Sequence, residues 1–200
     1  MLRIDAQHGF LLPAQDPAWL ATILRRNRFE GSVLLEDGDA TAALKTAEEF
    51  TYIRAVIARR PLLHPLVKSV YLEDPGLEQL ARLGTLQLEV PAKALPQIRH
   101  ITDRRVALDG IPEDIEALPP NFYIKLTGFR LPAGIEQSEK LQRLLCHPGP
   151  ERLMFATGWP HGEVPWKERL AAFTQSLGAM PTELREQILG GTACEFYQIT

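Results

Sequence analysis

The chain has 200 residues, of which 45% are hydrophobic and 24% charged, with a formal net charge of −3 and a sequence pI near 6.0. This composition is typical of a folded globular protein with one sizeable core, and it argues against disorder. The small negative charge offers no basic face for nucleic acid or for an anionic membrane, so neither is an expected partner.

The first residues and the cysteines indicate a compartment. MLRIDAQHGFLLPAQD lacks a charged segment followed by a long apolar run, and no stretch approaches the roughly 18 apolar residues that cross a bilayer. Cys146 and Cys194 show no CxxC spacing, which favours reduced thiols over a disulfide or a metal site. We therefore expect a cytoplasmic protein in which residues 1–200 form a single domain.

Short apolar runs alternate with segments of helical periodicity along the chain. Such alternation predicts parallel strands joined by crossover helices. Asp16, Asp39 and Asp74 are expected to cap the helices that follow them. The predicted strands cover residues 2–6, 32–36, 52–57, 67–72, 85–90, 105–109, 122–127 and 153–157. The predicted helices cover residues 17–27, 39–49, 74–83, 92–101, 135–147 and 165–177.

Eight strands with helices between them predict an α/β fold, a reduced TIM-type (β/α)8 barrel. The connections ARRPLLHP and GIPEDIEALPPN are too short for a helix, so one or two crossover helices should be short or missing. Flanks without helices would expose apolar strand faces, which predicts a homodimer that covers them. A doubly wound open sheet is the alternative fold, but AQHGFLLP supplies no glycine-rich phosphate loop after the first strand.

Five segments match one family in chain order. RIDAQHGF is similar to Ile-Asp-Ala-His-x-His-Phe, RRVALDGIP to Val-x-Asp-His-x-Gly-x-Pro, and FYIKLTGF to Val-Lys-Leu-Ser-Gly. ERLMFATGWPHG is similar to Arg-Leu-(Met/Leu)-Phe-Gly-Ser-Asp-Trp-Pro, and LREQILGGTACEFYQI to a closing helix with Ile-Leu-Gly-x-Asn-Ala-x-x-Phe-Tyr. The chain thus resembles the amidohydrolase-related proteins of the metal-dependent hydrolase superfamily, particularly the branch with 2-pyrone-4,6-dicarboxylate lactonase and sugar-lactone hydrolases.

The resemblance implies that chemistry is carried at the carboxyl ends of the strands. At the positions of the family's two first-strand histidines this chain has Gln7 and Gly9, with His8 between them. The histidine after the sixth strand corresponds to Gly110. The aspartate after the eighth strand, which ligates metal or takes a proton from the attacking water, corresponds to Gly158. Because strand neighbours point to opposite sides, His8 cannot simply replace the ligands that flanked it.

These replacements weigh against the family's reaction. A hydrolytic metal needs about three His, Asp, Glu or Cys ligands, and a metal-free lactonase still needs a general base. We therefore expect a hydrolase-like pseudoenzyme without a cofactor, which binds a small molecule or a partner. The alternative is a working hydrolase of a lactone, carboxylic ester or amide. It would use a site rearranged from His8, Asp109, Lys125 and His161, with a weakly bound divalent metal such as zinc.

Each candidate also has a structural interpretation. Asp109 can bond loop backbone, and Lys125, which matches the family's lysine on the seventh strand, can form a buried ion pair with Glu89 or Asp109. His8 and His161 would lie side by side at the barrel mouth if the first and eighth strands close the cylinder. The residues expected to line a pocket are Gln7, Glu89, Thr127, Thr157 and Trp159, and the indole of Trp159 would form the pocket floor.

Overall fold

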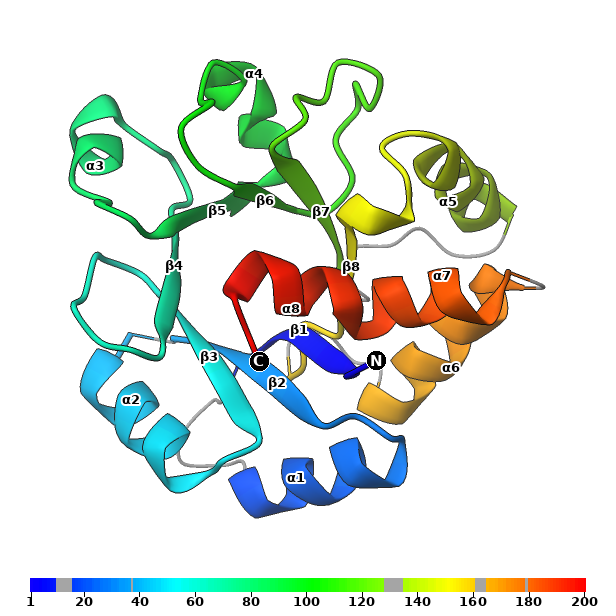
Figure 1. The fold of residues 1–200 in the computed structure, drawn as a ribbon, viewed down its shortest axis with the longest axis horizontal. Helices are drawn as coiled ribbons and strands as arrows, with labels where there is room; N and C mark the ends of the chain where they lie inside the picture. Colours follow the sequence, from blue (N-terminus) through cyan, green and yellow to red (C-terminus); the bar gives the residue numbers. More distant parts are fainter. Residues whose placement is uncertain (10–15, 37, 128–134, 161–164, 179) are drawn as a thin grey trace.

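The computed structural model describes residues 1–9, 16–36, 38–127, 135–160, 165–178 and 180–200. Eight parallel strands follow one another around a ring in the order β1 to β8, and the helices that connect the strands lie outside that ring (Figure 1). This arrangement confirms the predicted (β/α)8 barrel. The strands are β1 (Ile4–Gly9), β2 (Gly31–Leu35), β3 (Ile53–Ala58), β4 (Val67–Tyr71), β5 (Gln87–Pro91), β6 (Val106–Asp109), β7 (Phe122–Thr127) and β8 (Leu153–Ala156).

The helices differ widely in length, and those that follow β4 and β5 are short. The predicted helix over residues 92–101 is a 3-10 turn followed by a single α-helical turn, and the predicted helix over 74–83 is only five residues long. The helices are α1 (Pro17–Arg26), α2 (Ala40–Glu49), α3 (Leu77–Ala81), η1 (Ala92–Ala94), α4 (Leu95–Ile98), α5 (Ile135–Cys146), η2 (Pro150–Arg152), α6 (Trp166–Leu177), α7 (Thr182–Glu186), the π-helical η3 (Gln187–Gly191) and α8 (Thr192–Tyr197).

Two of the three predicted aspartate caps are confirmed. The carboxylates of Asp16 and Asp39 accept hydrogen bonds from backbone N–H groups in the first turns of α1 and α2. The prediction for Asp74 was wrong, because α3 begins later than expected. Gly76 occupies the cap position there, and its N–H donates to the side chain of Gln79 at 3.0 Å.

Alternation along each strand separates an outer apolar layer from the barrel interior. On β7, Phe122, Ile124 and Leu126 pack in the layer beneath the helices. Tyr123 belongs to a second, inner cluster, and Lys125 shares its face of the strand. The inward-facing positions, which alternate with these outer apolar residues, therefore hold the side chains that concern function.

Two crossover connections have no helix, as the sequence predicted. They are residues 59–66 between β3 and β4 and residues 110–121 between β6 and β7. Leu62 and Leu66 of the first connection, and Ile115 of the second, pack against the outer apolar layer. The connections themselves thus cover the strand faces that were expected to be bare. The homodimer therefore stays a prediction, and bare strand faces no longer support it.

The barrel closes between β1 and β8 at their carboxyl ends. The Gly9 N–H donates to the Trp159 carbonyl at 2.7 Å, and the Gly158 N–H donates to the Gln7 carbonyl at 3.0 Å. His8 and Trp159 form an isolated parallel bridge at the same place. β1 therefore reaches Gly9, three residues beyond the predicted end of the first strand, because these bonds continue its pairing.

The last helices close the opposite end of the barrel. In Figure 1, α8 lies across the ring beside β1, α7 lies at the rim near α6, and both chain ends lie near the middle of the ring. Ala193, Phe196 and Tyr197 of α8 are buried in the inner cluster together with Ile4. The amino-terminal end of the barrel is thus filled by apolar and aromatic side chains of α8.

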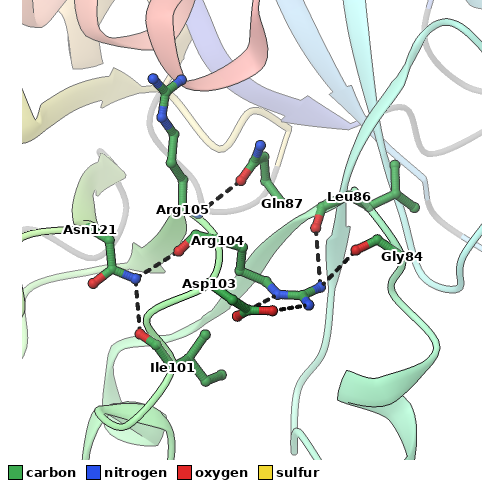
Figure 2. Close-up of polar contacts among 8 residues, drawn as sticks. All are labelled: Gly84, Leu86, Gln87, Ile101, Asp103, Arg104, Arg105 and Asn121. Atoms are coloured by element: carbon green, nitrogen blue, oxygen red, sulfur yellow. Dashed lines mark hydrogen bonds and ion pairs between the residues drawn. The ribbon is translucent and has the colours of Figure 1, made fainter.

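Polar contacts hold the segment before β6 to its neighbours (Figure 2). The Arg104 guanidinium donates to the carbonyls of Gly84 and Leu86 at 3.4 and 3.5 Å. The Asn121 amide donates to the carbonyls of Ile101 and Arg104 at 2.9 and 2.7 Å. These bonds fix the amino-terminal ends of β5, β6 and β7, the side of such barrels that serves stability.

Among the described residues, no helix is both long and apolar enough to cross a membrane.

Candidate functional site

An ion pair lies inside the barrel. Lys125 on β7 and Glu89 on β5 form a salt bridge, and the side chains of both residues are 0% exposed. Each lies two residues before the end of its strand, so the pair sits one layer below the carboxyl-terminal mouth. The sequence left open whether Lys125 lines a pocket or forms a buried pair, and the structure places it in a pair with Glu89.

Neutral groups satisfy the rest of the Glu89 carboxylate. The Ser69 hydroxyl donates to Oε1 of Glu89. The Tyr197 hydroxyl lies 3.0 Å from the same oxygen and 3.2 Å from the Ala6 carbonyl. Burial, and after it the charge of Glu89, raises the pKa of Tyr197 well above its ordinary value. The phenol therefore remains protonated and serves as a donor.

Gln7 faces the same interior. Its side-chain oxygen accepts a hydrogen bond from Nζ of Lys125 at 2.8 Å, and the residue is 3% exposed. Ala6 also belongs to the inner cluster, and the pairing of β1 with β2 shifts register between Asp5 and His8. A β-bulge of this kind lets two successive residues share one face of a strand. The bulge therefore directs Gln7 toward Lys125.

Asp109 and Thr127 lie at the mouth, as the last residues of β6 and β7. The Thr127 hydroxyl donates to the Asp109 carboxylate at 2.5 Å, and the two side chains are 0–2% exposed. Gly110 follows with a φ of +100°, a backbone conformation in which side chains are rare. The loop after β6 thus leaves the strand through a turn that favours glycine.

His8 is fully buried at the end of β1. Burial lowers the pKa of its imidazole to about 3, although a hydrogen bond with the Val33 backbone opposes the shift. The ring is therefore neutral at physiological pH. By alternation His8 points away from Gln7 and the interior network. Trp159, which is paired with His8 through the backbone, is half-buried. Its ring centroid lies 5.3 Å from that of Trp19, and the two rings are tilted by 32°.

Thr157 takes part in a cluster outside the barrel wall. Its N–H and hydroxyl donate to the Asp5 carboxylate at 2.9 and 2.6 Å, and the Trp166 indole of α6 donates to the same carboxylate at 2.8 Å. Arg169 of α6 donates to the Thr157 carbonyl at 2.5 Å. Burial raises the pKa of Asp5, and these hydrogen bonds oppose the rise. Thr157 therefore joins β1, β8 and α6 instead of facing the interior.

The sequence did not single out Arg59, which lies at the mouth beyond β3. Its Nε donates to the Glu36 carbonyl at 3.2 Å, and its backbone N–H donates to the Glu36 carboxylate at 3.0 Å. The guanidinium lies 4.7 Å from the ring centroid of Tyr71. Because Tyr71 belongs to the inner cluster, this cation covers the β2–β4 side of the mouth. The preference of arginine side chains for aromatic faces could have suggested such a contact. The pairing of Arg59 with Tyr71, however, depends on the register of β3 and β4.

The candidate residues thus separate into distinct places. Gln7, Glu89 and Lys125 meet inside the barrel, whereas Asp109 and Thr127 meet above them at the strand ends. The prediction that His161 lies beside His8 falls outside the described residues. Within the described part of the chain, no three His, Cys, Asp or Glu side chains are grouped closely enough to hold a metal ion.

Comparison with known structures shows the same fold. An amidohydrolase from Burkholderia multivorans with bound HEPES has 18% sequence identity and a TM-score of 0.80, with 100% of both chains covered. A second crystal form of an amidohydrolase from that organism, with bound zinc, has a TM-score of 0.79 at 18% identity and the same coverage. A probable 2-pyrone-4,6-dicarboxylic acid hydrolase from Acinetobacter baumannii, with citric acid bound, has a TM-score of 0.76 at 16% identity, again over 100% of both chains.

The family can be read from the sequence itself. No curated protein matches the chain significantly. The sequence model of the amidohydrolase family, however, matches residues 96–199, which is more than half of the 200 residues. This match contains β6, β7, β8 and the closing helices, where four of the five motifs noted in the sequence lie, while RIDAQHGF at the first strand lies outside it. The chain therefore belongs to the amidohydrolase family.

Proposed function

We propose that this amidohydrolase-family barrel binds a small molecule at its carboxyl-terminal mouth and does not carry out metal-dependent hydrolysis. The observation that carries the proposal is the buried ion pair of Lys125 and Glu89, together with the bond from Lys125 to Gln7. These contacts join an ammonium group to Gln7, which stands at the position of one of the family's two first-strand histidines. The charge of Lys125 is already balanced by Glu89.

The residues at the family's ligand positions do not fit a zinc ion. Gln7 is neutral, and its side-chain oxygen already accepts from the Lys125 ammonium, which would repel a second cation. Gly9, Gly110 and Gly158 have no side chains to offer. Zinc prefers thiolate, imidazole and carboxylate ligands. We therefore derive no step of a reaction through a metal.

The mouth still offers groups that recognise ligands. The Nε of Arg59 is bonded to the Glu36 carbonyl and its plane lies against Tyr71, so the side chain is held in one orientation. The two terminal nitrogens of its fork suit a polar or anionic group. Asp109 and Thr127 lie at the ends of β6 and β7, but they are buried and bonded to each other, so Arg59 carries the recognition in this proposal. Similar barrels with HEPES or citric acid bound support the choice of a small molecule.

A rearranged hydrolase is the competing function. It would need a nucleophile or general base that reaches a bound substrate. Lys125 is inaccessible and paired, and His8 is buried on the face opposite Gln7. Asp109 is the remaining described candidate at the strand ends, and its carboxylate accepts from Thr127. The geometry therefore favours binding over turnover.

The proposal is tested by thermal shift with citrate and γ-butyrolactone as probes, combined with product analysis. We expect at least one probe to raise the melting temperature of the unmodified protein, and Arg59→Gln to weaken that shift. Arg60→Gln is the matched control, because Arg60 is an exposed neighbour of Arg59 and its replacement removes the same charge. Accumulation of hydrolysed lactone beyond the uncatalysed rate would contradict the proposal.

A further inference from the structure

A groove lies on the outer side of the barrel where the crossover helix between β3 and β4 is missing. It has a volume of about 470 Å³. The end of α2, the amino-terminal halves of β3 and β4 and the last residues of the chain form its walls. A smaller cavity of about 160 Å³ lies beside it, and Lys68 and Gln198 line both. This space is remote from the mouth, since its walls come from the opposite ends of the strands.

Two cations line the groove. Arg54 is exposed and Lys68 is half-buried. Across the part of the chain that the structure describes, neither side chain forms an ion pair or a hydrogen bond. Glu48, an acidic residue of the same groove, lies 3.2 Å from the His64 imidazole. An anion bound beside Arg54 and Lys68 would therefore meet two positive charges that no salt bridge among the described residues neutralises, although Glu48 in the same walls would oppose it.

The position of Arg54 is built into the strands. Gly31 on β2 is buried, and a Cβ atom at that position would lie 2.6 Å from Cγ of Arg54. The arginine stem thus occupies the space that any other residue at position 31 would fill. This packing limits the freedom of the stem of Arg54, a residue that lines the groove. Less rotational entropy is then lost when a ligand binds.

We propose that this groove binds the oxyanion group of a small molecule, a phosphate or a carboxylate. Arg54 provides paired N–H donors, which match the planar edge of such groups, and Lys68 adds a compact positive charge. Thr51 and Gln198 provide a hydroxyl and an amide in the same walls. The volume suits a small molecule. The site is independent of the function proposed for the mouth.

The test is a titration of the full chain with inorganic phosphate, and separately with citrate, followed by amide chemical shifts at constant ionic strength. We expect saturable shifts at Arg54, Lys68 and Gln198. Joint replacement by Arg54→Gln and Lys68→Gln should weaken binding of the better probe by at least about tenfold, which corresponds to about 1.4 kcal/mol. Phosphate and citrate distinguish the two sources of the oxyanion.

The matched control replaces Arg25 and Arg26, two exposed cations in the last turn of α1, by glutamine. It removes the same charge from a different surface and should leave the affinity unchanged. Two results would overturn the proposal. One is the lack of saturable shifts with either probe. The other is an equal loss of affinity in both double variants, which would indicate attraction by overall charge alone.

Discussion

Lys125 and Glu89, 36 positions apart in the sequence, form a salt bridge with both side chains fully buried inside the barrel. Taking two charges out of water is costly, and the pair offsets that cost only while both members are present. The Ser69 and Tyr197 hydroxyls and the Gln7 amide complete the network.

Removal of one member should be much worse than removal of both. Lys125→Met leaves the Glu89 carboxylate buried without its cation, and we expect a loss of about 3–5 kcal/mol in the free energy of unfolding. Lys125→Met combined with Glu89→Gln should recover a large part of this loss, as measured by urea unfolding. Lys93→Met is the control, because it breaks an exposed pair with Glu73 and should cost less than about 1 kcal/mol. A single variant as stable as the double variant would contradict this interpretation.

His8 should make the fold sensitive to acid. Its folded pKa of about 3 lies below the unfolded value of 6.5, so the unfolded chain binds more protons between these values. The stabilising contribution of neutral His8 is complete above pH 6.5 and is lost as the pH falls toward 3. Between pH 6.5 and 5, the protein should lose about 2 kcal/mol more stability than His8→Gln does. Exposed His100 provides the control, His100→Gln, which should follow the unmodified protein.

Asp5 should hold β1, β8 and α6 together. In Asp5→Asn an amide replaces one of the oxygens that accept from Thr157 and Trp166, and at least one buried donor loses its acceptor. We expect a loss of about 2–4 kcal/mol in unfolding free energy. Asp16→Asn serves as the control, since asparagine also caps helices well and should change stability little. Equal stabilities of the two variants would show that the Asp5 cluster contributes nothing.

The sequence predicted the elements that depend on local patterns. Eight apolar runs gave eight strands, and the short, proline-containing connections before β4 and β7 lack helices. The caps at Asp16 and Asp39 follow from local chemistry. The cap at Asp74 did not form, because Gly76 and Gln79 provide a competing start for the helix.

The interior network depends on contacts that no local pattern contains. Whether Lys125 meets Glu89 or Asp109 is decided by the register of β5, β6 and β7. Thr157 has a polar side chain at a strand end, which suggested a pocket position. Its contact with Asp5 spans 152 positions and requires the closed barrel. The β-bulge in β1 that turns Gln7 inward likewise follows from pairing with β2.

Restoring the family's aspartate alone should not create a hydrolase. Gly158 has a φ of +62°, a left-handed conformation that Asp tolerates better than most residues. Gly158→Asp should therefore fold, but it would add a single carboxylate to positions that otherwise lack metal ligands. We expect no zinc-dependent lactone hydrolysis from this variant. Turnover by it would show that the remaining residues already form a competent site.

Joint replacement should raise the affinity for zinc, with one structural restriction. Gln7→His, Gly9→His and Gly158→Asp together supply the imidazole and carboxylate ligands that zinc prefers. Addition of Gly110→His places a side chain at a φ of +100°, so the fourfold variant should be less stable than the threefold one by about 1–3 kcal/mol. Calorimetric zinc titration and thermal unfolding of both variants check these outcomes. Equal stability of the two would show that the turn after β6 adapts to histidine.

We propose that the interior of this barrel holds the Lys125–Glu89 pair and that the barrel binds no hydrolytic metal. The most direct measurement is the zinc and manganese content of the purified, unmodified protein, determined together with its turnover of γ-butyrolactone after zinc is added. We expect metal well below one ion per chain and no lactone hydrolysis above the uncatalysed rate. Near-stoichiometric zinc accompanied by lactone turnover would contradict it.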